Sequence, residues 1–192
     1  MFRIAILVLP RWFAAPIVVS SVLLGYFVST SHYSWEILLA VLSAVFIMAF
    51  GHAMNTFLDF YWTKFDQGEK RSKPKPYTSG QQVLATGAVT GRMVLVTALI
   101  YLAISLVFSI YISLHYHAWA MIPWTIAALS TFWYSWGKLH YQCELALGVG
   151  FGPAAALLGV AISPDPNVID AVLASITIAI IFGFAAEAFD QW

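Results

Sequence analysis

Uncharged apolar stretches recur along the chain at intervals that predict membrane-spanning helices. A helix needs about 20 mainly apolar residues to cross the hydrocarbon core of a bilayer. Six stretches reach or approach this length: residues 12–30, 37–58, 93–114, 118–136, 145–162 and 171–186. The last two are shorter, so we expect them to extend into their flanks or to lie tilted. The pattern predicts an all-α fold, a polytopic membrane helix bundle of about six transmembrane helices.

One connection between these stretches is long, and the others are short. Residues 59–92 form the long connection, whereas residues 163–167 (Ser-Pro-Asp-Pro-Asn) are typical of a turn. No internal repeat or low-complexity segment divides the chain. We therefore expect residues 1–192 to form a single membrane domain.

The basic residues predict how the bundle is oriented. All nine lie on one side of the six-span arrangement: Arg3, Arg11, Lys64, Lys70, Arg71, Lys73, Lys75, Arg92 and Lys138. The positive-inside rule places that side, with the N-terminus and the 59–92 loop, in the cytoplasm. The composition agrees with a multi-pass protein of the cell membrane, because 61% of the residues are hydrophobic and only 9% are charged. The formal net charge is zero, so nothing indicates a nucleic-acid partner.

The second apolar stretch ends in two polar residues, Asn55 and Asp59. They are four positions apart and share one face of a helix. An ionised carboxylate near membrane depth is costly, and this makes Asp59 a candidate functional residue. The alternative is that Asp59 only ends the helix at the level of the lipid headgroups.

The loop that follows combines carboxylates with cations. Asp66 and Glu69 precede a basic, proline-rich segment, residues 70–80. Mg²⁺ prefers oxygen ligands and is often shared between one or two Asp residues and substrate phosphates. Neighbouring cations bind the phosphate oxygens that a metal leaves free. The loop therefore predicts a site for a metal-bound phosphate or diphosphate, and the alternative is a basic loop that contacts anionic lipid.

Three motifs together resemble the UbiA superfamily of intramembrane prenyltransferases. The first is Asn55-x-x-x-Asp59 with Asp66 and Lys75-Pro76-x-x-Ser79-Gly80, and the second is the Tyr134-x-x-x-Lys138 spacing. The third is Glu144-Leu145 followed by Phe151-Gly152-Pro153, which is similar to 1,4-dihydroxy-2-naphthoate prenyltransferases in particular. All three stand in family order and at family distances.

The resemblance implies transfer of a polyprenyl group from its diphosphate to an aromatic acceptor, a quinone precursor, at the cytoplasmic face. Mg²⁺ would be bound by Asp59, Asp66 and Asp190. The diphosphate would contact Asn55, Arg71, Lys73, Lys75 and Lys138. The catalytic residues would be Asp59, Asp66, Tyr134 and Lys138, and we expect these groups to converge at the mouth of one central cavity.

The chain departs from the family pattern in four respects. Thr56 stands where the family usually has Asp, and Asp66 lies seven residues after Asp59, whereas the family has its further Asp four to six residues on. Lysines replace the common arginines at Lys73 and Lys75. Asp190 matches only the beginning of the family's second Asp-rich motif. We therefore expect the chain to correspond to the front part of such an enzyme and to transfer little prenyl group alone. The sequence leaves the acceptor, the prenyl chain length and the oligomeric state open.

Two other classes of protein fit the sequence less well. A small-molecule transporter should carry ionisable residues deep inside its spans, and only His52 and Asn55 are obvious candidates here. A non-catalytic membrane fragment or scaffold would bind no diphosphate. Magnesium-dependent diphosphate binding separates all three alternatives.

Overall fold

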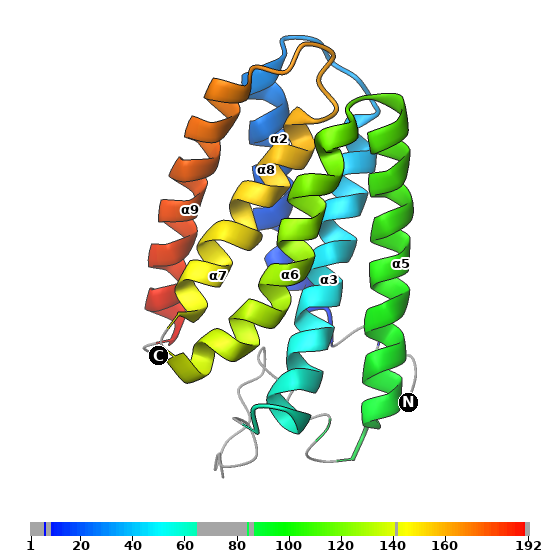
Figure 1. The fold of residues 1–192 in the computed structure, drawn as a ribbon, viewed down its shortest axis with the longest axis vertical. Helices are drawn as coiled ribbons and strands as arrows, with labels where there is room; N and C mark the ends of the chain where they lie inside the picture. Colours follow the sequence, from blue (N-terminus) through cyan, green and yellow to red (C-terminus); the bar gives the residue numbers. More distant parts are fainter. Residues whose placement is uncertain (1–5, 7–8, 65–83, 85–86, 141, 191–192) are drawn as a thin grey trace.

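The chain folds into a bundle of α-helices (Figure 1). The structure is a computed structural model, which describes residues 6, 9–64, 84, 87–140 and 142–190. All regular secondary structure in these ranges is helical. The α-helices are α2 (Ala15–Ser29), α3 (Ile37–Tyr61), α5 (Gly91–His115), α6 (Met121–Gly137), α7 (Cys143–Gly150), α8 (Gly152–Val160) and α9 (Val168–Asp190), and the short 3-10 helices are η1 (Trp12–Ala14), η3 (Ala118–Ala120) and η4 (Lys138–His140).

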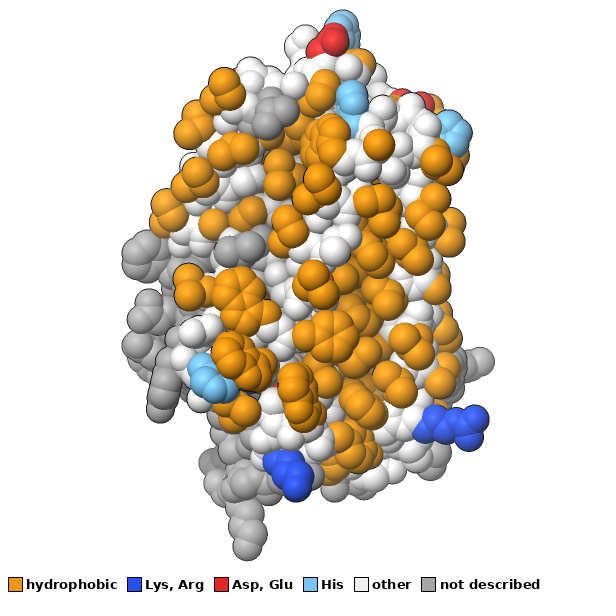
Figure 2. Space-filling view, viewed as in Figure 1, with side chains coloured by type: hydrophobic (Ala, Val, Ile, Leu, Met, Phe, Trp, Pro, Cys, Tyr) orange, Lys and Arg blue, Asp and Glu red, His pale blue; other side chains and the backbone are white. Residues whose placement is uncertain are grey.

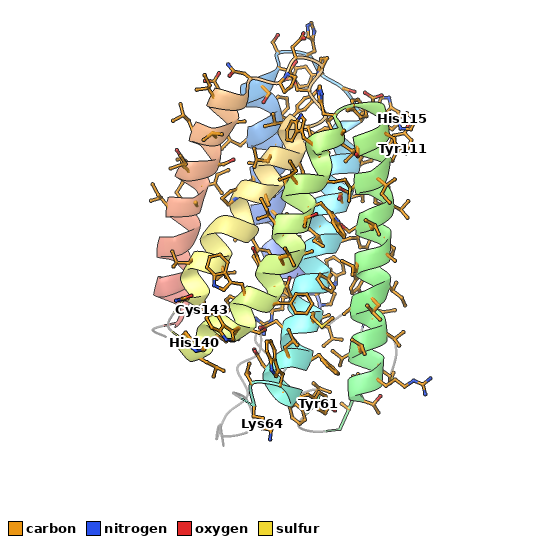
Figure 3. All side chains as sticks on the ribbon, viewed as in Figure 1. Tyr61, Lys64, Tyr111, His115, His140 and Cys143 are labelled. Carbon is orange, nitrogen blue, oxygen red and sulfur yellow. The ribbon has the colours of Figure 1, made fainter. Side chains whose placement is uncertain are left out.

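Helix α3 lies near the middle of the bundle and packs against α5, α6 and α2. Helix α2 also packs against α8 and α9. The last turn of α3, the beginning of α5 and the ends of α6 and α9 lie at the lower end in Figure 1. We call this the Asp59 end, and the other the opposite end. Tyr61, Lys64 and His140 mark the Asp59 end in Figure 3, and Tyr111 and His115 mark the opposite end.

Among the described residues, two helices, α3 and α5, are long and apolar enough to cross a membrane. Shorter apolar helices cover Ala15–Ser29, Leu145–Val160 and Ile169–Ile181. Hydrophobic side chains cover most of the face seen in Figure 2, and its Lys and Arg side chains lie near the Asp59 end. Length and composition thus agree with a membrane bundle for part of the chain.

Helix boundaries differ from the sequence prediction at two places. The predicted span 145–162 consists of two helices, α7 and α8, that meet at Phe151. Pro153 explains this break, because its nitrogen cannot donate the hydrogen bond that would continue α7 into α8. Helix α3 continues to Tyr61, so Asp59 lies inside a helix and the loop predicted over 59–92 begins later. Helix α9 extends beyond the 171–186 stretch at both ends, as expected for a stretch that is short for a membrane span.

A buried polar bridge joins α3 to α5 midway along the bundle. Ser105 Oγ donates to the Ser43 carbonyl oxygen at 2.7 Å, and Ser43 Oγ donates to the Ser105 carbonyl oxygen at 3.2 Å. Trp124 Nε1 donates to Ser105 Oγ at 2.9 Å and thereby adds α6 to the bridge. Serine hydroxyls bonded in this way allow close packing of helices without an unsatisfied polar group.

Two glycines allow a very close approach of α2 and α8. A Cβ atom at Gly25 would collide with the carbonyl oxygen of Ala156, and one at Gly159 would collide with that of Val22. Both colliding atoms belong to the backbone and cannot rotate away. The contact between α2 and α8 therefore requires glycine at both positions.

The Gly159→Ala variant should be clearly less stable than the wild type. Alanine favours a helix over glycine by up to about 1 kcal/mol, but forcing two backbones apart costs about 1–3 kcal/mol or more. We expect a lower midpoint of thermal unfolding for the purified protein. Gly148→Ala is the matched control, because its Cβ would lie 3.5 Å from the Ala179 carbonyl oxygen, an ordinary contact. Equal midpoints for the two variants would contradict the close packing of α2 and α8.

Candidate functional site

A polar stripe runs along one face of α3 toward the Asp59 end. His52, Asn55 and Asp59 are spaced at i, i+3 and i+7, which aligns their side chains on a helix. Asn55 is 3% exposed and Asp59 is 0% exposed. A buried charge requires a compensating partner, because removing it from water costs several kcal/mol.

Lys138 is the partner of Asp59. Its Nζ donates to Asp59 Oδ2 at 2.5 Å, and its side chain is 14% exposed. The same Nζ lies 4.7 Å from the ring centroid of Tyr134, within the range of a cation–π contact. Burial disfavours the charged form of Lys138, but Tyr134 and Asp59 outweigh it and raise the pKa of Lys138 above its ordinary value. Lys138 is therefore a cation at this site.

A second contact joins the same two helices one turn away. Ser135 Oγ donates to Asn55 Oδ1 at 2.8 Å, and Ser135 is fully buried. The sequence analysis did not identify Ser135. Its spacing from Lys138, i to i+3, nearly matches the i to i+4 spacing of Asn55 and Asp59. The similar helical spacing of these two polar pairs was the sequence signal that polar side chains of α3 contact those at the end of α6.

The second oxygen of Asp59 lacks a hydrogen-bond partner in the described part of the chain. Asp59 Oδ1 is buried, and no described group bonds to it. An unpaired carboxylate oxygen usually costs about 1–3 kcal/mol or more, and such atoms call for an explanation. A carboxylate oxygen is a ligand that Mg²⁺ prefers, so this atom fits a metal ion that the rest of the site would complete.

The structure brings together four of the residues that the sequence analysis selected: Asn55, Asp59, Tyr134 and Lys138. The other candidates, Asp66, Arg71, Lys73 and Lys75, lie outside the described residues. The side chain of Asp190 is also outside the described part, although its backbone ends α9. Within the described residues there is no cluster of three or more metal-binding side chains. The roles of all these residues in metal and diphosphate binding stay predictions.

Arg11 is a further cation in the described part of the chain, directly before η1. Its Nε is buried and has no hydrogen-bond partner among the described residues. The sequence analysis used Arg11 only for the orientation of the bundle.

The apolar interior contains a small cavity away from this cluster. It has a volume of about 10 Å³, room for about one water molecule, and Ile47, Ala127 and Phe151 are among the residues that line it. It is far too small for a prenyl chain. The described residues thus provide charged groups at one end of the bundle, and this interior cavity does not accommodate a long apolar ligand.

Comparison with known proteins adds no assignment. No protein-family model matches the chain, and neither a curated protein nor a solved structure matches it.

Proposed function

We propose that the chain is a multi-pass membrane protein whose Asp59 end faces the cytoplasm. Two helices in the described part of the chain have the length and composition of membrane spans. Of the four basic residues whose positions are described, Lys64 follows α3, Arg92 lies at the beginning of α5 and Lys138 directly follows α6, and these helix termini belong to the Asp59 end. The fourth, Arg11, precedes η1 and α2. The opposite end carries Glu36, Asp165 and Asp170 instead. This distribution supports the orientation that the positive-inside rule predicts.

We further propose that the Asp59 end binds a prenyl diphosphate together with Mg²⁺ and transfers the prenyl group to an aromatic acceptor. The observation that supports this most is the state of Asp59. Its carboxylate is fully buried, with one oxygen on Lys138 and the other without a described partner. A purely structural ion pair would be expected to satisfy both oxygens. An ion pair with one unbonded carboxylate oxygen, at a bundle end that also carries Lys64 and Arg92, suits a site that is completed by a ligand.

Each residue of the cluster has a chemical task in this proposal. Asp59 would hold the metal ion, and Ser135 would fix the Asn55 amide beside it. Lys138 would contact a diphosphate oxygen, and the Tyr134 ring would hold its Nζ in place. Bound Mg²⁺ would act as a Lewis acid and stabilise the negative charge on the oxygens of the diphosphate. When the allylic C–O bond breaks, its electron pair leaves with the diphosphate, and Lys138 would stabilise that growing charge. The acceptor ring would then supply the electrons of the new carbon–carbon bond and lose a proton.

The proposal predicts magnesium-dependent binding of prenyl diphosphate. Purified protein in detergent or nanodiscs should bind radiolabelled geranylgeranyl diphosphate in the presence of Mg²⁺. Chelation of the metal should weaken binding by at least about 10-fold, because the carboxylate and the diphosphate would then repel each other. Geranylgeraniol, which has the same tail without the charge, serves as the control ligand and should show no dependence on Mg²⁺.

The same experiment separates the alternatives. A membrane scaffold would bind the alcohol and the diphosphate equally, through their tails alone. Binding of the diphosphate that is unaffected by chelation would favour a basic surface that contacts anionic lipid. Either result would reject a metal-dependent diphosphate site.

A further inference from the structure

A trough of about 360 Å³ lies between α2 and α9 near the opposite end of the bundle. The two helices pack against each other there (Figure 1). Ligand sites usually have volumes of about 300–1,000 Å³, so the trough is large enough for a ligand. It is lined by two residues of α2 and four of α9: Leu24, Val28, Asp170, Leu173, Ala174 and Thr177.

Most of the trough is apolar. Leu24, Val28 and Leu173 are exposed, and each presents a hydrocarbon side chain. The Thr177 hydroxyl donates to the Leu173 carbonyl oxygen at 3.0 Å, so its proton is not available to a ligand. Seven residues separate Asp170 from Thr177, a rise of about 10 Å along a helix. The trough therefore suits part of a hydrocarbon chain that lies along the two helices.

Asp170 is the charged residue among those that line the trough. It lies in the first turn of α9, where Asn167 Nδ2 donates to its Oδ2 at 2.6 Å. The alternative role of Asp170 is helix capping alone, since its backbone N–H donates to Asn167 Oδ1 at 3.3 Å. Capping occupies one carboxylate oxygen, however, and no described Lys or Arg forms an ion pair with Asp170. The other oxygen can therefore accept from a cationic ligand.

We propose that the trough binds a membrane lipid whose headgroup carries a primary amine. The ammonium group would contact Asp170, and one hydrocarbon chain would lie between α2 and α9. Charge complementarity selects this ligand, because the opposite end carries the carboxylates Glu36, Asp165 and Asp170. An ammonium group offers three N–H donors to a carboxylate, whereas an anionic headgroup would be repelled. The inference uses the membrane placement proposed above and does not depend on prenyl transfer.

The test counts the lipids bound to purified protein in detergent by native mass spectrometry. Phosphatidylethanolamine, phosphatidylcholine and phosphatidylglycerol with identical oleoyl chains are titrated separately. We expect phosphatidylethanolamine to bind about fivefold more tightly than phosphatidylglycerol, the upper range for an exposed charge pair. Phosphatidylcholine should bind less tightly than phosphatidylethanolamine, because its quaternary ammonium group has no N–H donor.

Asp170→Asn should reduce the preference for phosphatidylethanolamine over phosphatidylglycerol to less than about twofold. Asparagine keeps an oxygen that can accept from Asn167 Nδ2, so the cap of α9 is retained and the wild-type midpoint of thermal unfolding is expected. Asp165→Asn is the matched control: Asp165 is an exposed carboxylate at the same end that does not line the trough, and its replacement should leave the preference unchanged.

A second set of variants tests where the hydrocarbon chain lies. Ala174→Trp fills the trough and should weaken binding of all three lipids by at least about threefold, because the chain loses its packing against both helices. Ala174 is partly buried, so Leu173→Trp, at an exposed position of the same wall, provides a second filling variant. Ile180→Trp is the control, because Ile180 is exposed on α9 outside the trough.

Four results would overturn the inference. Equal affinity of the wild type for phosphatidylethanolamine and phosphatidylglycerol, or for phosphatidylethanolamine and phosphatidylcholine, would mean that no primary amine is selected. Unchanged binding in both filling variants would place the lipid outside the trough. Lipid-free dimers that disappear in Ala174→Trp would assign the trough to a second copy of the chain. Magnesium-dependent binding of geranylgeranyl diphosphate should be the same in all these variants, so the proposed function stands or fails separately.

Discussion

Asp59→Asn is expected to abolish magnesium-dependent binding of prenyl diphosphate. The substitution keeps the size of the side chain and removes the negative charge and one carboxylate oxygen, the two properties that a Mg²⁺ ligand needs. Loss of a direct metal ligand should weaken metal-dependent binding by at least on the order of 100-fold, since even the residues that orient metal ligands contribute about 10–100-fold. Titration with Mg²⁺ at fixed diphosphate concentration measures this effect directly.

Asp170→Asn provides the matched control. Asp170 lies near the beginning of α9 at the opposite end, where Asn167 Nδ2 donates to its carboxylate at 2.6 Å. The same chemical change at that place should leave binding unaltered. If Asp59→Asn retained the magnesium dependence of the wild type, Asp59 would not be a metal ligand.

The sequence predicted the helical framework well, for a simple physical reason. A long apolar stretch without charges favours a helix whatever its neighbours are, because all its backbone hydrogen bonds form within the segment. Each of the six predicted stretches contains helix in the structure. The break at Phe151 was the main difference, although Pro153 was a visible signal for it.

Contacts between helices were predictable only where polar residues are rare. Asn55 and Asp59 stood out on α3, and Lys138 was the basic residue near the end of α6, so their proximity followed from a shared bundle end. The contact between Ser135 and Asn55 did not follow. A serine in an apolar helix more often bonds to its own backbone, as Ser29 does with the Gly25 carbonyl oxygen.

Other features depend on three-dimensional packing that no local pattern encodes. Gly25 and Gly159 allow the closest approach of α2 and α8. The segment before α2 is anchored by Leu9 in the core and by Trp12, which packs against Tyr101. Such relations appear only when the helices are placed beside one another.

Lys138→Met is expected to be the most destabilising single substitution at the site. Asp59 is fully buried, and its described charge partner is Lys138. Removing one partner of a buried pair costs about 3–5 kcal/mol, because the remaining charge has neither water nor a counter-ion. Methionine keeps most of the length of the lysine side chain. The loss of stability therefore reflects the missing charge and not a change in side-chain volume. Thermal unfolding in one detergent, at one pH, measures the change.

The double variant Asp59→Asn with Lys138→Met completes the argument. It removes both charges, and replacing a buried ion pair by neutral groups is often close to neutral for stability. We therefore expect the double variant to recover most of the stability lost in Lys138→Met, a coupling of about 2–3 kcal/mol between two touching residues. Lys64→Met is the control, because Lys64 is an exposed lysine at the same end and its loss should change the unfolding midpoint little. Additive effects of the two site substitutions would mean that Asp59 and Lys138 do not depend on each other for burial, and the ion pair could then not be the framework of a diphosphate site.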